Sequence, residues 1–368
     1  FRRVLFRSDG NIVDTVILAG ENGCGKTTLL NIIYDFSIIS TTGEVTNEKR
    51  IFNIILSQNE LENIAFLNED KMFLTGEFQI MQDFTTAPNY WSRIKVKYCL
   101  KNIGNNELTW KDVESSRLFT IPDVKSLFKS LYSTVEINYS PRETSTVTSK
   151  EVDEKIKSSV KSGDDLSTEI KQMFIDIQNN DANELNEWVS NNIGKVPPID
   201  VIDKRINRFK SAFSYIFEGL NYKGIKTDRG KKDVIFTTHN KDVSISALSS
   251  GEKQIVFRGG FLLKDKQSTE GCIVLIDEPE VSLHPTWQKK ILSYYRKLFI
   301  DTNANQTSQI FVVTHSPFIV HNVERINDKV IVLKKENNNK IIILDKPEYY
   351  AYGNLEIVED AFNVSLFT

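Results

Sequence analysis

Residues 12–36 read IVDTVILAGENGCGKTTLLNIIYDF, and this stretch decides the fold. Its apolar, β-branched first part, Ile12 to Ala19, predicts a buried strand that ends at Gly20. From Lys26 onward, apolar residues return at the spacing of a helix, at Leu29, Leu30, Ile32, Ile33 and Phe36. A strand, a glycine-containing loop and a helix therefore follow one another, which is typical of an α/β fold.

The loop between that strand and helix, Gly20 to Thr27, fits the pattern G-x-x-x-x-G-K-[ST]. Its glycines let successive backbone N–H groups point inward, where they and the helix N-terminus bind a phosphate chain. Lys26 adds positive charge for the β- and γ-phosphates, and Thr27 offers a hydroxyl to Mg²⁺. The alternative, an accidental glycine-rich turn, does not account for the flanking strand and helix. The predicted loop contacts are Asn22, Gly23, Cys24, Gly25, Lys26, Thr27 and Thr28.

A second apolar run, Cys272 to Ile276, predicts a strand that delivers two carboxylates at its polar end. Adjacent strand residues point to opposite faces, so Asp277 and Glu278 can take different roles. We expect Asp277 to hold the water shell of Mg²⁺ and Glu278 to orient and deprotonate an attacking water. Read alone, the pair is equally compatible with a solvated strand end, and the phosphate loop is what favours the catalytic interpretation.

Three further segments carry a family resemblance. Leu248 to Gln254 (LSSGEKQ) resembles the signature sequence of ABC-type ATPases. Asp277 to Pro285 (DEPEVSLHP) resembles the Walker B and D-loop of SMC, RecF and OLD-type ATPases, and Thr314 to Pro317 (THSP) resembles their switch-histidine segment. With the phosphate loop, the motifs follow the family's order. The chain is identified as an ABC-type P-loop ATPase of this group.

The resemblance implies how the site works. ATP is sandwiched twice in a head-to-tail homodimer, where Ser249, Ser250 and Gly251 close over the γ-phosphate held by the other copy. His315 contacts the γ-phosphate and is expected to act in catalysis beside Glu278. The residues themselves leave an alternative open, because a serine before a helix is also a plain N-terminal cap.

Two positions depart from the family's pattern. The glutamine that such ATPases place near the metal could be Gln58, Gln79 or Gln82, and we assign Gln79 as the metal contact. His284 stands where transporter cassettes carry an aspartate, which fits the RecF and OLD side of the group. Adenine contacts expected before Ile12 are not recognisable.

The predicted organisation is α/β, with two α/β lobes and a helical insert. Lobe I spans 1–115, the mainly helical insert 116–232, and lobe II 233–368. Strand-like pieces between 75 and 100 predict an antiparallel sheet in lobe I. Residues 1–8, FRRVLFRS, resemble a translated sequencing adapter, and we expect them to be non-native, although a genuine strand in a fragment is the alternative.

Composition and charge indicate where the protein is located and which classes of partner it can bind. The net charge of −3 gives no overall field that attracts nucleic acid. Local basic runs at Lys204 to Lys210 and Lys223 to Lys232 could contact phosphates, but a solvated helix face and a surface loop are favoured. No apolar run reaches membrane-spanning length, and the three scattered cysteines argue against a disulfide framework. We therefore expect a cytoplasmic protein without a membrane partner.

The organisation most resembles the AAA family ATPases of the Septu and retron anti-phage systems, where the ATPase works with a separate nuclease. The resemblance implies ATP hydrolysis that closes and opens the dimer. One alternative is a RecF or OLD-type DNA repair or nuclease ATPase that is cut off before its nuclease domain. Another is an ATP-loaded binding switch with little hydrolysis.

Overall fold

The computed structural model describes residues 7–8, 11–37, 48–55, 77–85, 95–100, 110–112, 129–134, 166–198, 205–228, 231–264, 271–301, 303, 305–324, 327–336, 341–345 and 353–362. The chain divides into two compact units. The smaller comprises 1–5 and 31–129, and the larger comprises 6–30 and 130–368. The three-part division expected from the sequence stays a prediction.

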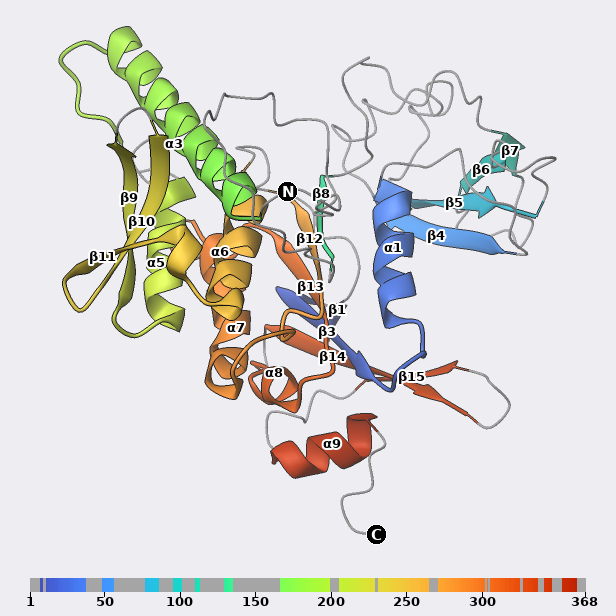
Figure 1. The fold of residues 1–368 in the computed structure, drawn as a ribbon. Coiled ribbons are helices and arrows are strands. Elements are labelled where there is room, and N and C mark those ends of the chain that lie inside the picture. The colour runs from blue at the N-terminus through green and yellow to red at the C-terminus, as the bar shows by residue number, and fades with distance from the viewer. Residues whose placement is uncertain are drawn as a thin grey trace. The chain divides into compact units, whose positions relative to one another are not determined.

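The larger unit is built on a six-stranded sheet in the order β15-β14-β3-β13-β12-β8 (Figure 1). Neighbouring strands are parallel except for β15, which pairs antiparallel with β14. The carboxyl ends of β3, β13 and β12 therefore meet at one edge, where ligands gather in sheets of this kind. The strands are β3 (Thr15–Gly20), β8 (Ser130–Ser133), β12 (Ile273–Asp277), β13 (Gln309–Val313), β14 (Asp328–Lys335) and β15 (Ile341–Asp345).

The central strand β3 is buried along its whole length, as are β12 and β13. A strand covered on both faces reads as a continuous apolar run, which explains why the sequence predicted these strands well. The loop after β3 leads into α1 (Lys26–Ser37), as expected from the change to helical spacing. The α/β fold predicted from the sequence is confirmed.

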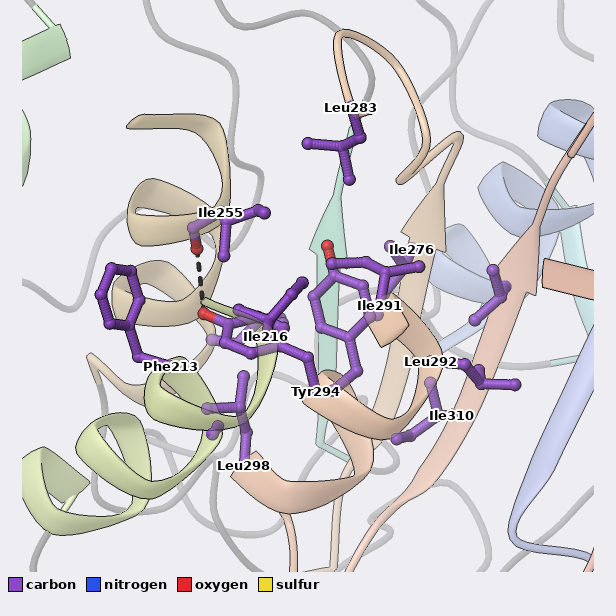
Figure 2. Close-up of a cluster of buried hydrophobic side chains, with 14 of the residues drawn as sticks. Phe213, Ile216, Ile255, Ile276, Leu283, Ile291, Leu292, Tyr294, Leu298 and Ile310 are labelled. Atoms are coloured by element: carbon purple, nitrogen blue, oxygen red, sulfur yellow. Dashed lines mark hydrogen bonds between the residues drawn. The ribbon is translucent and has the colours of Figure 1, made fainter. Parts of the chain in front are cut away.

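Among the described helices of the larger unit, four that precede β13 in the chain contribute to the core around this sheet. They are α3 (Leu166–Asn191), α5 (Arg205–Ile216), α6 (Ser250–Leu263) and α7 (Pro285–Leu298). Figure 2 shows side chains of α5, α6 and α7, including Phe213, Ile255 and Ile291, gathered in one cluster with Ile276 and Ile310 from the sheet. Within it, the Tyr294 hydroxyl donates to the Ile255 carbonyl at 2.9 Å, which satisfies a buried polar group. This packing holds α6 against the strands that carry the site.

A three-stranded antiparallel sheet lies in the same unit, in the order β11-β10-β9. Its strands are β9 (Leu220–Asp228), β10 (Lys231–Thr238) and β11 (Lys241–Ser244). The surface loop predicted for Lys223 to Lys232 is therefore wrong, because most of that run lies in β9 and β10. The other basic run is not a free cationic face, since Arg205 is buried and its Nε donates to Asp181 at 2.9 Å.

After the switch segment come α8 (Pro317–His321), the β14–β15 pair and α9 (Asn354–Phe362). Ile357 and Ala361 of α9 belong to the main core, and Lys334 of β14 pairs with Asp360 at 3.2 Å. These contacts dock α9 on the larger unit. In the described part of the chain, no helix is both long and apolar enough to cross a membrane.

The smaller unit contains a four-stranded sheet in the order β4-β5-β6-β7, with every pair antiparallel. The antiparallel sheet predicted in this region is confirmed. A separate short pair, β1 (Arg7–Ser8) with β2 (Asn11–Ile12), belongs to the larger unit. The strands of the four-stranded sheet are β4 (Lys49–Ile55), β5 (Glu77–Asp83), β6 (Lys95–Leu100) and β7 (Lys111–Asp112).

Candidate functional site

The glycine-rich loop leaves β3 at a point of close approach between two strands. Gly20 has φ +140°, and a Cβ added there would lie 2.1 Å from the carbonyl oxygen of Leu333 on β14. A side chain at this position would overlap the neighbouring backbone. Gly25, with φ +84°, occupies the left-handed region that favours glycine just before α1 begins. The loop conformation therefore depends on glycine for both steric and conformational reasons.

Lys26 lies inside this loop. Its Nζ donates to the carbonyl oxygens of Gly20 at 2.9 Å and Glu21 at 2.8 Å, and only 4% of the residue is exposed. Burial lowers the pKa of the ammonium, while nearby Cys24 and the carboxylates of Glu278 and Asp277 favour its charged form. The loop carbonyls thus hold a cation beside the N-terminus of α1.

Asp277, at the end of β12, joins the loop from across the sheet. Its Oδ1 accepts a hydrogen bond from the Thr27 hydroxyl at 3.1 Å, and the residue is 2% exposed. The solvated strand end considered from the sequence therefore does not apply. Burial raises the pKa of Asp277 to about 6, and the charge of Glu278 also raises it, whereas Thr27, Arg258 and Lys26 lower it.

Thr27 and Asp277 fit the coordination chemistry of Mg²⁺. This ion is bound in proteins by one or two oxygen side chains together with waters and substrate phosphates. Thr27 and Asp277 place a hydroxyl and a carboxylate oxygen side by side next to the phosphate loop. No cluster of three or more His, Cys, Asp or Glu side chains suited to a metal occurs among the described residues. The pair fits an ion that is held partly by a phosphate ligand.

Glu278 and His315 converge from adjacent parallel strands. Asp277 pairs with Val313 in the β12–β13 register, and the Glu278 N–H donates to the Val313 carbonyl at 2.9 Å. The Glu278 carboxylate lies 3.5 Å from His315 Nε2, and both side chains are 30% exposed. Glu278 has φ +42°, which is strained for a residue with a side chain and is often found at functional sites.

The surroundings of His315 favour its neutral form. Burial lowers its pKa below the ordinary value, the charge of Lys26 lowers it further, and Glu278 acts in the opposite direction. The imidazole ring lies 6.2 Å from the ring of Phe362 on α9, measured between centroids. The C-terminal helix therefore contacts the switch segment, although the sequence indicated no such contact.

Glu280 is a further candidate site residue, and the motifs in the sequence did not indicate it. Its Oε1 accepts a hydrogen bond from the backbone N–H of His315 at 2.6 Å. Burial raises the pKa of its carboxyl group. Glu280 thus fixes the backbone that presents the switch histidine. Its position in the D-E-P-E run of residues 277–280 was visible, but nothing in that run distinguished an inward-facing carboxylate from an exposed loop residue.

Arg258 is a second missed residue, and it lies on α6, the helix that begins at the signature motif. It is 1% exposed, and its Nη1 donates to the Asp277 carbonyl at 3.1 Å and to the Ser133 hydroxyl at 3.2 Å. Within one chain, Arg258 therefore links the signature helix to the end of β12. A buried arginine in a helix carries no recognisable sequence signal beyond its unusual apolar surroundings.

The signature residues form the start of α6. Ser249 is its N-cap, and a capping box is complete: the serine hydroxyl accepts from the Glu252 N–H, and the Ser249 N–H donates to Glu252 Oε2 at 2.7 Å. A Cβ added to Gly251 would lie 2.7 Å from the Ser282 carbonyl, so the helix start packs tightly on the segment after Walker B. The cap interpretation is confirmed, and the role of Ser249, Ser250 and Gly251 toward a second copy stays a prediction.

The remaining candidates are a histidine and three glutamines. His284 caps α7, since its Nδ1 accepts from the Thr286 N–H at 3.3 Å. Gln79 belongs to the smaller unit, where its Nε2 donates to Asn53 at 2.6 Å, and its assignment as a metal contact stays a prediction. Gln82 is buried on the same strand, and Gln58 lies outside the described residues.

Comparisons with known proteins show the family to which the chain belongs. A family described as an AAA ATPase domain matches residues 38–320. The retron Ec83 probable ATPase of Escherichia coli is 25% identical over 381 residues, covering 85% of this chain and 66% of that protein. The Septu protein PtuA of Bacillus thuringiensis is 26% identical over 168 residues, covering 41% of this chain and 40% of that protein. The chain thus spans less than two thirds of either relative.

Among solved structures, an SMC head crystallised with the C-winged helix domain of ScpA resembles the fold. The match covers 92% of both chains with a TM-score of 0.50 and 13% identity. At this identity the likeness concerns the fold alone. It confirms the P-loop ATPase architecture of ABC type that the motifs predicted.

Proposed function

Because the chain belongs to the AAA ATPase domain family, we propose that it binds ATP with Mg²⁺ and hydrolyses the bond to the γ-phosphate. The observation that carries this proposal is the hydrogen bond from Thr27 to Asp277, which joins the phosphate loop to the end of β12. Glu278 and His315 lie beside that junction, 3.5 Å apart. A phosphate-binding loop, two metal-binding oxygens and a carboxylate base are the parts that phosphoryl transfer to water needs.

Each residue has a role that follows from its position. The loop N–H groups and the Lys26 ammonium bind the β- and γ-phosphates. Thr27 and Asp277 would hold Mg²⁺, which neutralises charge on the phosphate oxygens when it is bound. Glu278 is exposed enough to accept a proton from water, and His315, kept neutral by burial, donates a hydrogen bond to a phosphate oxygen. Glu280 holds the His315 backbone in place.

The test is steady-state phosphate release by the Glu278→Gln variant. The amide keeps the shape of the side chain but cannot accept the proton, so we expect turnover to fall about a hundredfold or more. ATP binding should remain, because the phosphate loop is unchanged. Glu218→Gln is the matched control, since Glu218 is an exposed carboxylate that pairs with Lys290 away from the loop. Unchanged turnover in Glu278→Gln would instead favour an ATP-loaded switch that barely hydrolyses.

We further propose that two copies close over ATP, with Ser249 of each reaching the nucleotide of the other. In support, the signature start is exposed and polar at a helix N-terminus, and Arg258 links its helix to Asp277. Hydrolysis at Glu278 would then reopen the dimer. A second copy is thus a partner whose contribution completes the site.

For the biological role, we propose that the chain is the ATPase of a bacterial anti-phage system that acts with a separate nuclease. The proposal is supported by the likeness to the retron ATPase and the Septu protein. It is tested by plaque counts on bacteria that carry the complete locus with wild-type or Glu278→Gln protein. Protection that survives the substitution would contradict a role for hydrolysis in defence.

A further inference from the structure

Two exposed isoleucines lie on the edge strand β15 beside the phosphate loop. Ile341 is 43% exposed and Ile343 is 69% exposed, whereas the alternate residues of the strand, Ile342 and Leu344, are half-buried. Leu344 packs against the main core. The opposite face of the strand therefore presents large apolar side chains that the larger unit's core does not use.

The register places these isoleucines at the edge of the sheet where the loop begins. Leu333 of β14 pairs with Ile343 on one side and with Gly20 on the other. Ile341 pairs with Lys335, the last residue of β14, so it lies farther toward the carboxyl edge than Gly20. Its Cδ1 atom is 3.7 Å from where a Cβ on Gly25 would be, so the side chain lies beside the loop. Figure 1 shows β15 next to the turn between β3 and α1.

The two flanks of β3 differ in chemistry. On the side of β13 and β12 lie the ionisable groups of Asp277, Glu278 and His315, which suit the terminal phosphate and the metal. On the side of β14 and β15 lie Ile341 and Ile343. A nucleoside triphosphate bound along the loop, with its γ-phosphate at the ionisable flank, directs its α-phosphate and nucleoside to the opposite flank. There the flat, weakly hydrated face of a base gains by covering exposed aliphatic side chains.

We propose that Ile341 and Ile343 form the surface on which the nucleobase rests, so that β15 contributes binding energy for the nucleoside part of the ligand. The inference rests on the proposed nucleotide function and deepens it. It distinguishes ligands that carry a base from bare polyphosphates. The two isoleucines take the place of the adenine contacts that could not be recognised before Ile12.

The experiment compares a ligand with a base and one without. Calorimetric titrations of Mg-ADP and Mg-pyrophosphate are made with wild-type protein and with the Ile341→Thr/Ile343→Thr double variant. Threonine keeps the β-branched shape that strands favour while replacing apolar surface with a hydroxyl. We expect ADP affinity to fall about tenfold, because each buried methylene contributes measurably to binding, while pyrophosphate affinity stays within about twofold.

Ile51→Thr serves as the matched control, since Ile51 is a comparably exposed isoleucine on β4, an edge strand of the four-stranded sheet. It should change neither affinity. If the double variant binds ADP like wild type, or loses both ligands equally, the base surface is refuted while nucleotide binding stands. If wild-type protein binds neither ligand, the proposed function fails and the inference fails with it.

Discussion

The phosphate loop and the signature start are both polar segments at the N-terminus of a helix, yet they satisfy their polar groups in opposite ways. At the loop, one side chain has a partner in a distant part of the chain, because Thr27 binds Asp277, 250 residues away. At the signature, Ser249 binds Glu252, three residues away. One segment takes shape only when the sheet assembles, whereas the other is complete within a single helical turn. The phosphate loop therefore depends on the folded sheet for its structure. The signature start is a local helix cap whose serine stays exposed.

The largest expected effect is on stability, and it comes from disturbing the contact between the phosphate loop and β14. Gly20→Ala places a Cβ against the Leu333 carbonyl at a φ that L-residues rarely adopt. We expect a loss of about 3 kcal/mol or more in the free energy of unfolding, measured by urea denaturation. Gly23→Ala is the control, because a Cβ there meets nothing within 4 Å, although its φ is also positive. Equal losses in the two variants would mean that the approach to β14 is not what constrains the loop.

The next effect concerns the exposed side of the signature start, at Ser249. In the Glu278→Gln background, the light-scattering mass should double on addition of Mg-ATP, and Ser249→Arg should abolish the doubling because its side chain fills the space that a second copy's phosphates need. Ser211→Arg, at an exposed serine on α5, should leave the doubling intact. A doubling that survives Ser249→Arg would remove the support for a site shared between copies. The lost N-cap itself should cost only about 1 kcal/mol of stability.

The smallest effect concerns protonation of His315. Its pKa is lowered in the folded protein, so the unfolded chain binds the proton more readily. The neutral ring's contribution to stability is complete above the unfolded pKa of about 6.5 and is lost as the pH falls through the lower folded pKa. His315→Asn should therefore flatten the dependence of unfolding free energy on pH below about 6.5. Parallel curves for both proteins would show that His315 is not the group responsible.

The same contrast explains what the sequence could predict. The loop, Asp277, Glu278 and His315 stand at the ends of apolar runs, and a parallel sheet brings such ends together by its topology. Glu280 and Arg258 act through contacts set by tertiary packing, and neither has a pattern of its own. The sequence therefore predicts the site residues that follow strands. It does not predict the residues whose hydrogen bonds hold those strand ends in place.

Strand β9 was missed for a different reason. Leu220 and Tyr222 are buried and alternate with the exposed Asn221 and Lys223, which is the period of a strand. The lysines in this stretch, Lys223 and Lys226, favoured a solvated loop instead. Charged side chains on the solvent-exposed face of a sheet are compatible with a strand. The alternation of apolar and polar residues is therefore the better indicator of a strand when lysines in the same segment favour a loop.

The capping box at Ser249 has a consequence for anion selectivity. A serine hydroxyl carries one proton, and here that proton is donated to the Glu252 carboxylate at 2.7 Å. A phosphate oxygen that binds Ser249 competes with Glu252 for the proton and is repelled by its negative charge. Free phosphate or sulfate has no second point of attachment, so we expect it to bind Ser249 weakly. An anion delivered on a rigid neighbouring surface approaches at a high effective concentration and can displace the carboxylate.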